Sequence, residues 1–262
     1  MALLRSLIFT LLFFLSAEAA SPSAFVSEAV WQQVKEYIMP NDHPAKSKLD
    51  KIFSHSRAFS NFDTMEAAGF AYAKPQHHTH IIVTRHPKLK GYVIKAYLDM
   101  QKYHLGQPEH FFWVKRVIGS RLIRDSIQAH QYGHLLKVPK KWIYLLPDKP
   151  SPPSAYLRKM FILVEEDMDI YNDVKNEQMW GSPSATKELL RALFTVITEH
   201  GFFDCAKPAN CPFSKDGRVA LVDTQTYYKK RVKYSKLTPF LSPAGRIYWK
   251  KLIEKNKKAT KG

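Results

Sequence analysis

The chain has 262 residues, of which 45% are hydrophobic and 13% aromatic, enough to bury the core of one domain or of two small lobes. This composition excludes a chain that is disordered throughout. Lys and Arg outnumber Asp and Glu by 40 to 23, giving a formal net charge of +17, so anionic partners are favoured.

The N-terminal segment is typical of a signal peptide. Arg5 precedes a short apolar stretch at 7–15, and Ala-Glu-Ala at 17–19 matches a cleavage site. The stretch is too short for a transmembrane anchor, which needs about 20 apolar residues. We therefore expect residues 1–19 to be a Sec-type signal peptide and the protein to be exported, whether periplasmic, secreted or in the secretory-pathway lumen. An uncleaved anchor is the alternative.

The next predicted elements are a short helix at 29–37 and two strands at 79–84 and 92–98. The loop between the strands, residues 86–91, predicts a hairpin. Alternation along the second strand puts Tyr92, Ile94 and Ala96 on one face, and Val93, Lys95 and Tyr97 on the other.

A long helix is predicted at 109–131, where apolar residues recur at near-helical spacing, although Gly119 is unfavourable in its middle. A strand bounded by prolines is predicted at 138–147, and an apolar run at 160–164 leads into acidic residues at 165–169. These carboxylates could face a nucleotide ribose or cap the following helix.

The clearest helix is predicted at 185–200, and a hairpin follows it. Asp-Gly at 216–217 is a tight-turn signal, and the apolar run at 219–222 predicts a short buried strand. This hairpin puts Asn210 and Asp223 at its two ends. Two oxygen ligands held in this way could share a Mg²⁺ ion.

The segments around Asn210 and Asp223 resemble the active site of protein kinases. In that family a catalytic loop of the form His-Arg-Asp-Leu-Lys-Pro-x-Asn precedes a strand that ends in Asp-Phe-Gly. Here Lys-Pro-Ala-Asn at 207–210 and Val-Asp-Thr at 222–224 fall at the matching spacing. Upstream, Gly-Tyr-Val-Ile-Lys at 91–95 is similar to the family's strand that carries a phosphate-binding Lys.

The resemblance implies an α+β fold of two lobes. Residues 20–164 would form an N-terminal region and a small β-rich lobe, and residues 165–262 a reduced helical lobe with a basic C-terminal tail. It also implies an ATP- and Mg²⁺-dependent phosphotransferase. The order of elements matches the family over roughly residues 66–228, but identical residues number only about a dozen.

The resemblance also implies a role for each matched residue. Asn210 and Asp223 would hold Mg²⁺, and Lys95 would bind phosphate oxygens while it pairs with a helix carboxylate. Asp125 is the only acid in the relevant half of the predicted helix. Asp204 would orient the acceptor hydroxyl, and Lys207 would stabilise charge on the transferred group.

Several departures from the family pattern favour an inactive protein. No Gly-x-Gly-x-x-Gly precedes Lys95, and Asp204 is displaced by one position from the family's catalytic Asp. No Ala-Pro-Glu follows Asp223. The alternative function is therefore a catalytically inactive, pseudokinase-type binding module whose basic tail engages an anionic partner.

The tail at 229–262 holds twelve Lys or Arg residues and one acid, Glu254, and so carries +11 of the net charge. Apolar residues at helical spacing predict a basic amphipathic helix. Its apolar side either docks on the core or lies on an anionic membrane surface, and an acidic protein is a further candidate partner. Nucleic acid is not expected as a partner, since only the charge supports it and export argues against it.

Cys205 and Cys211 flank the segment that resembles a catalytic loop. Disulfides persist in the compartments that exported proteins enter. We therefore expect a bridge between the two residues. Two buried thiols are the alternative.

Overall fold

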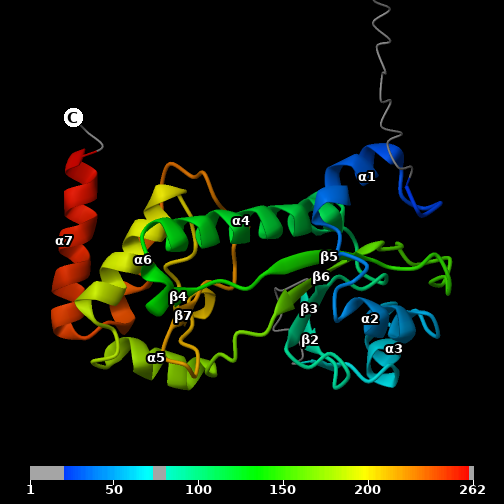
Figure 1. Ribbon diagram of the computed structural model, residues 1–262, viewed down its shortest axis with the longest axis horizontal. Helices are drawn as coiled ribbons and strands as arrows, with labels where there is room; N and C mark the ends of the chain where they lie inside the picture. Colours follow the sequence, from blue (N-terminus) through cyan, green and yellow to red (C-terminus); the bar gives the residue numbers. More distant parts are fainter. Residues whose placement is uncertain (1–20, 73–80, 260–262) are drawn as a thin grey trace, which may run out of the picture.

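The computed structural model describes residues 21–72 and 81–259, which form an α+β fold, as predicted (Figure 1). The predicted signal peptide lies outside the described residues. One part of the molecule contains the main sheet and the N-terminal helices, and the other contains the C-terminal helices. The long helix α4 (Glu109–Ala129) runs along both parts. Within the described ranges no helix is long and apolar enough to cross a membrane.

The main sheet has the strand order β1-β2-β3-β6-β5, and all neighbouring strands are antiparallel. The predicted hairpin is present in its described part as β2 and β3, with Gly91 at φ 84° in the connection. The strands are β1 (Ala71–Tyr72), β2 (Ile82–Arg85), β3 (Tyr92–Ala96), β5 (Lys141–Leu145) and β6 (Phe161–Glu166).

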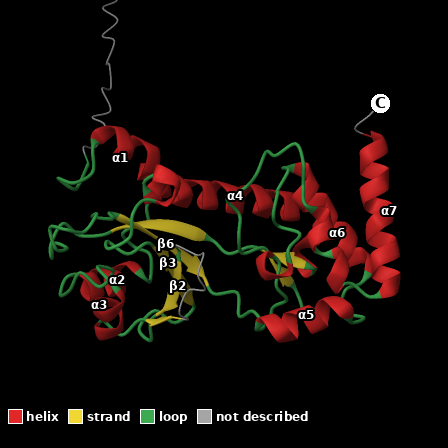
Figure 2. Cartoon of the chain, turned by 180° about the vertical axis from the view of Figure 1, so that it is seen from behind, coloured by secondary structure: helices red, strands yellow, loops and turns green. Residues whose placement is uncertain are grey.

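Different helices cover the two faces of this sheet (Figure 2). Helices α2 (Lys46–Phe53) and α3 (Phe62–Ala67) enclose a core with one face, and α1 (Glu28–Val34) and α4 enclose a core with the other. Alternation along β3 confirms the predicted faces. Ile94 and Ala96 belong to the first core, whereas Val93, Lys95 and Tyr97 line a cavity on the opposite side.

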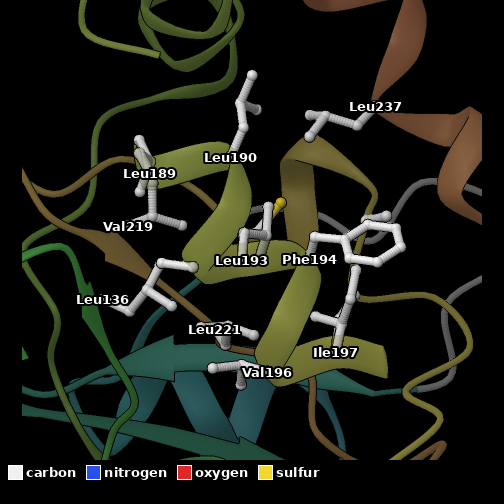
Figure 3. Close-up of a cluster of buried hydrophobic side chains, with 14 of the residues drawn as sticks. Leu136, Leu189, Leu190, Leu193, Phe194, Val196, Ile197, Val219, Leu221 and Leu237 are labelled. Carbon is white, nitrogen blue, oxygen red and sulfur yellow. The ribbon is translucent and has the colours of Figure 1, made fainter. Parts of the chain in front are cut away.

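The helical part consists of α5 (Asp173–Gly181), α6 (Lys187–Glu199) and α7 (Pro243–Ala259). Helix α6 is the helix predicted at 185–200. Its first turn is capped by Thr186, whose side chain accepts from Leu189 N at 3.1 Å, and its apolar stripe fills the centre of the core (Figure 3).

The core of the helical part also contains residues that precede position 164. Ile123 and Ile127 of α4 belong to it, as does Leu136 (Figure 3). Leu136 lies on β4 (Leu136–Lys137), which pairs in parallel with β7 (Val219–Ala220). The described residues after 164 therefore bury their apolar side chains partly against the first half of the chain.

Helix α7 docks its apolar side on this core. This is the first of the two alternatives predicted for the apolar side of the basic tail. Trp249 is fully buried, and its indole Nε1 donates to Tyr234 O at 3.0 Å. Lys250, Lys251 and Lys255 are exposed. The helix thus turns a lysine-rich side to solvent.

Candidate functional site

A cavity of about 670 Å³ opens between the main sheet and the loops of the helical part. Its volume falls in the range of roughly 300–1,000 Å³ that is usual for small-molecule sites. Strands β2, β3 and β6, helix α4 and the segments 209–210 and 222–225 contribute to its wall. The polar lining includes Arg85, Lys95, Arg116, Glu165, Asp167, Asn210, Asp223 and Gln225.

The predicted hairpin brings Asn210 and Asp223 to this cavity. Its turn is tight, because Gly217 N donates to Ser214 O at 3.0 Å and Gly217 has a φ of 85°, a value that favours glycine. At the open end of the hairpin, Val222 N donates to Asn210 O at 3.0 Å. Asn210 and Asp223 are therefore close neighbours in space, although thirteen positions separate them in the sequence.

The strand that leads to Asp223 is buried, as predicted. Val219 N donates to Leu135 O at 2.9 Å, and Leu221 N donates to Lys137 O at 2.9 Å. Both side chains lie in the core of the helical part (Figure 3). This anchoring fixes the backbone immediately before Asp223.

Lys95 has a different carboxylate partner from the one predicted. Its Nζ lies 2.8 Å from Glu165 Oε1, and the Nζ of Lys141 lies 3.1 Å from Glu165 Oε2. The register of the sheet explains the cluster: Glu165 is directly opposite both Lys141 and Val93, so Lys95 is its diagonal neighbour. Both ammonium groups also donate to Val222 O, at 3.3 Å and 2.8 Å.

The Lys95–Asp125 pair expected from the sequence is not formed. Asp125 is exposed on α4, and the α4 residue that lines the cavity is Arg116. Nine residues separate the two, about two and a half turns at 3.6 residues per turn, so they lie on opposite sides of the helix. The cavity thus has a cation where the resemblance implies a helix carboxylate.

Asp223 lies beside this cation. Arg116 Nη2 is 3.4 Å from Asp223 Oδ1, an oxygen that is buried and accepts no hydrogen bond from the described residues. Arg116 Nη1 donates to Gln225 Oε1. Burial acts to raise the pKa of Asp223, but the charges of Arg116, Lys95 and Lys141 outweigh it and hold the pKa below its usual value. The carboxylate is therefore ionised at neutral pH.

Cations gather around Glu165 at the base of the cavity, although the cavity lining as a whole is acidic. Three cations, Lys95, Lys141 and Arg116, meet two carboxylates, Glu165 and Asp223, which leaves a net charge of about +1 when all are ionised. Lys95, Lys141, Arg116 and Glu165 are buried, so solvent screens their charges only weakly. The lining as a whole holds three cations, Arg85, Lys95 and Arg116, and five acids, Glu165, Glu166, Asp167, Asp173 and Asp223. Its net charge is therefore about −2 when all are ionised, which favours an anionic ligand only if the ligand arrives with a cation.

Asp204 and Lys207 are not part of the cavity lining. Asp204 Oδ1 lies 3.6 Å from Lys233 Nζ, and the side chain of Lys207 is exposed. Their backbone carbonyls hold the loop instead: Asp204 O accepts from Asn210 Nδ2 at 3.0 Å, and Lys207 O accepts from Asn210 N at 2.8 Å. Of the matched residues, the structure brings together Lys95, Asn210 and Asp223.

The predicted disulfide is wrong, because Cys205 and Cys211 are free and fully buried. Cys205 Sγ donates to Asp223 O at 3.1 Å, and Cys211 Sγ donates to Lys207 O at 3.2 Å. Burial raises the pKa of both thiols. The two residues thus connect the loop through thiol hydrogen bonds, the alternative left open by the sequence.

The acidic run at 165–169 does not cap the following helix. Helix α5 is capped by Asn172, whose Oδ1 accepts from Lys175 N at 2.9 Å. Asp167 forms a bidentate pair with Arg85, with distances of 2.7 Å and 3.2 Å, at the wall of the cavity. Lys141 faces the same side as Glu165 because the two are directly opposite in the sheet, and the unbroken apolar run that follows Lys141 gave no signal of this.

The residues at the hairpin suit a magnesium ion. Mg²⁺ in nucleotide sites is held by one or two protein oxygen ligands together with phosphate oxygens and water. Asn210 supplies an amide oxygen and Asp223 an ionised carboxylate that has an unfilled acceptor position. In the part of the chain that the structure describes, no cluster of three or more His, Cys, Asp or Glu residues forms a metal cage. The fit is therefore to an ion that arrives with phosphate ligands.

No protein-family model matches the chain, and a comparison with curated proteins finds no match either. The kinase resemblance therefore depends on the motifs and on the geometry of the cavity.

Proposed function

We propose that this chain is a protein-kinase-like protein that binds ATP in the cavity between the sheet and the helical part and acts as a phosphotransferase. The observation that carries the proposal is the convergence of Lys95, Asn210 and Asp223 on one cavity. Lys95 lies more than a hundred positions from the other two in the sequence, and all three are among the residues that the motifs match. Lys95 supplies a donor for phosphate oxygens, and the net acidic lining suits a phosphate-bearing ligand that carries a cation.

In the proposed complex, each residue contacts a different part of the bound nucleotide and its metal ion. Lys95 donates to phosphate oxygens, and Glu165 fixes the position of its ammonium group. Asn210 and Asp223 offer oxygen ligands to Mg²⁺, which when bound neutralises charge on the phosphates. The buried thiol of Cys205 holds the backbone carbonyl of Asp223, so the ligand set is preorganised.

A catalytically silent, pseudokinase-type binding module is the second candidate function. The observation that favours it is the position of Asp204, whose carboxylate lies near Lys233 and outside the cavity lining. Phosphoryl transfer in kinases uses an Asp that accepts the proton of the acceptor hydroxyl. In this candidate the cavity binds nucleotide without transfer, and the exposed lysines of α7 engage an anionic membrane surface or an acidic protein.

A thermal-shift titration tests nucleotide binding. The chain without residues 1–19 is titrated with ATP in the presence of Mg²⁺ or Mn²⁺, beside Lys95→Met, Asp223→Asn and the matched surface variants Lys90→Met and Asp63→Asn. A ligand that binds only the folded state adds about 2.7 kcal/mol at 100 times its dissociation constant. We expect a metal-dependent rise in Tm that the two cavity variants lose and the two surface variants keep.

The absence of a rise in a folded wild-type protein at millimolar ATP would overturn the proposal. If nucleotide binds, incubation with γ-labelled ATP and mixed protein acceptors separates the two candidates. Labelled product that depends on Asp223 supports the phosphotransferase. Binding without transfer at any acceptor supports the silent module.

A further inference from the structure

A second, smaller cavity of about 240 Å³ lies between α4, the start of β5 and the segment 36–40. It is separate from the cleft that holds Asn210 and Asp223. Four cationic side chains line it, and Glu36 is the acid in its lining. The cations are Arg121, Arg124, Lys140 and Lys141.

One of these cations is already paired. Lys141 Nζ is directed to Glu165, at 3.1 Å. The other three, Arg121, Arg124 and Lys140, form no ion pair with a carboxylate of the described chain. Three unpaired cations against one acid leave the cavity lining at about +2 when all groups are ionised.

The two arginines have only neutral hydrogen-bond acceptors. Arg121 Nη2 donates to Glu36 O at 3.3 Å, and its guanidinium lies 4.9 Å from the centre of the Tyr37 ring. Arg124 Nη2 donates at 3.3 Å both to Ser120 Oγ and to Pro139 O. A guanidinium has five N–H donors in a planar fork, so most donors of both arginines are uncommitted to the protein.

The environment of Arg124 also shows that its charge is under-compensated. Burial lowers the pKa of Arg124; the charges of Glu166 and Asp125 oppose this effect, and Arg121 adds to it. The Glu166 carboxylate itself accepts from Lys140 N at 2.8 Å. Two guanidinium groups at one cavity repel each other unless an anion lies between them. An oxyanion would supply acceptors for the uncommitted donors and would remove this repulsion.

We propose that this second cavity is a binding site for a phosphate group, in the form of inorganic phosphate or of a small phosphomonoester. Paired arginines bind phosphate oxygens in bidentate geometry. A cavity needs about 10–15 Å³ of accessible volume to hold one water molecule, so a cavity of about 240 Å³ has room for a phosphate group with several waters. The inference is independent of nucleotide binding in the larger cleft.

Calorimetric titration with inorganic phosphate tests this site. Lys95→Met serves as the background that weakens phosphate binding in the larger cleft. In this background we compare Arg121→Gln/Arg124→Gln with the control Arg231→Gln/Arg246→Gln, which removes the same charge from exposed positions in the basic C-terminal segment. We expect saturable phosphate binding in the Lys95→Met background. The Arg121/Arg124 variant should raise the dissociation constant at least tenfold, and the control variant should change it less than twofold.

A second arm replaces phosphate by phosphoserine, with serine as its control. Tighter binding of phosphoserine identifies the phosphomonoester as the better ligand, and tighter binding of phosphate identifies the free anion. Equal phosphate affinity in the Arg121/Arg124 variant and the control would overturn the proposal, as would a lack of binding in the Lys95→Met background. If the double variant does not fold, Arg121→Gln and Arg124→Gln are measured singly, with an expected weakening of at least threefold each.

Discussion

Lys95 and Glu165 form a buried ion pair across β3 and β6, with 2.8 Å between Nζ and Oε1. Glu165 is also the partner of Lys141, so one carboxylate compensates two buried ammonium groups. The pair links the cavity wall to the strand that leads into the helical part. Its position depends on strand register rather than on α4.

Substitution of Glu165 by Gln should strongly destabilise the fold. The change leaves the ammonium groups of Lys95 and Lys141 buried without a carboxylate, and the loss of one partner of a buried pair costs about 3–5 kcal/mol. Asp169→Asn is the matched control, because Asp169 pairs with Lys215 on an exposed surface, where such a pair contributes at most about 1 kcal/mol. Denaturant unfolding of both variants measures the difference. Equal losses would contradict the role given to Glu165.

Because of Lys141, the free energy of unfolding should depend on pH above about pH 8. Burial lowers its pKa to about 8 from 10.5; Glu165 opposes the shift, and Lys95 and Arg116 add to it. Between pH 8 and 10.5 the unfolded chain therefore binds more protons than the folded chain, so this group's contribution to stability rises with pH. We expect Lys141→Met to lose this rise, measured by denaturant unfolding across the window. Lys90→Met, at an exposed position, should keep it.

Gly119 should not tolerate even an alanine. A Cβ at this position would lie 1.8 Å from the backbone oxygen of Thr224, the residue after Asp223. The helix propensity of Ala would add about 1 kcal/mol of stability, but the overpacking costs about 1–3 kcal/mol or more. Gly119→Ala should therefore lower Tm and weaken ATP binding by displacing Asp223. Gly133→Ala, whose Cβ meets no atom within 4 Å, should change Tm little. A similar fall of Tm in both variants would argue against the close approach of α4 to Thr224.

The two cysteines should be inert in the folded protein. The thiolate is the reactive form, and burial raises the pKa of both Cys205 and Cys211. A thiol reagent at about pH 8, near the pKa of a free thiol, should modify neither residue under native conditions and both in denaturant without reductant. Failure to find two thiols in the denatured chain would show that the two residues form a bridge.

Local sequence patterns predicted the elements that have strong periodicity. Helix α6, strand β3 and the hairpin before Asp223 all follow from apolar spacing and from the Asp-Gly turn. Helices α2 and α3 were missed because they are short, and their position is set by packing against Ile94 and Ala96. Gly119, which weakened the prediction of α4, is explained by its contact with Thr224.

The candidate site was only partly predictable. Motif spacing identified Lys95, Asn210 and Asp223, because these residues follow recognisable local patterns. The roles of Glu165 and Arg116 depend on strand register and on the rotation of α4, which a sequence motif does not encode. The partner of Lys95 was therefore assigned to the wrong element.

A crystal structure of the protein with Mg²⁺ and a non-hydrolysable ATP analogue tests the central claim most directly. We predict nucleotide density in the cleft of about 670 Å³, with a phosphate oxygen at hydrogen-bonding distance from Lys95 and the ion between Asn210 and Asp223. Nucleotide bound elsewhere, or an empty cleft in a crystal soaked at millimolar analogue, would contradict it.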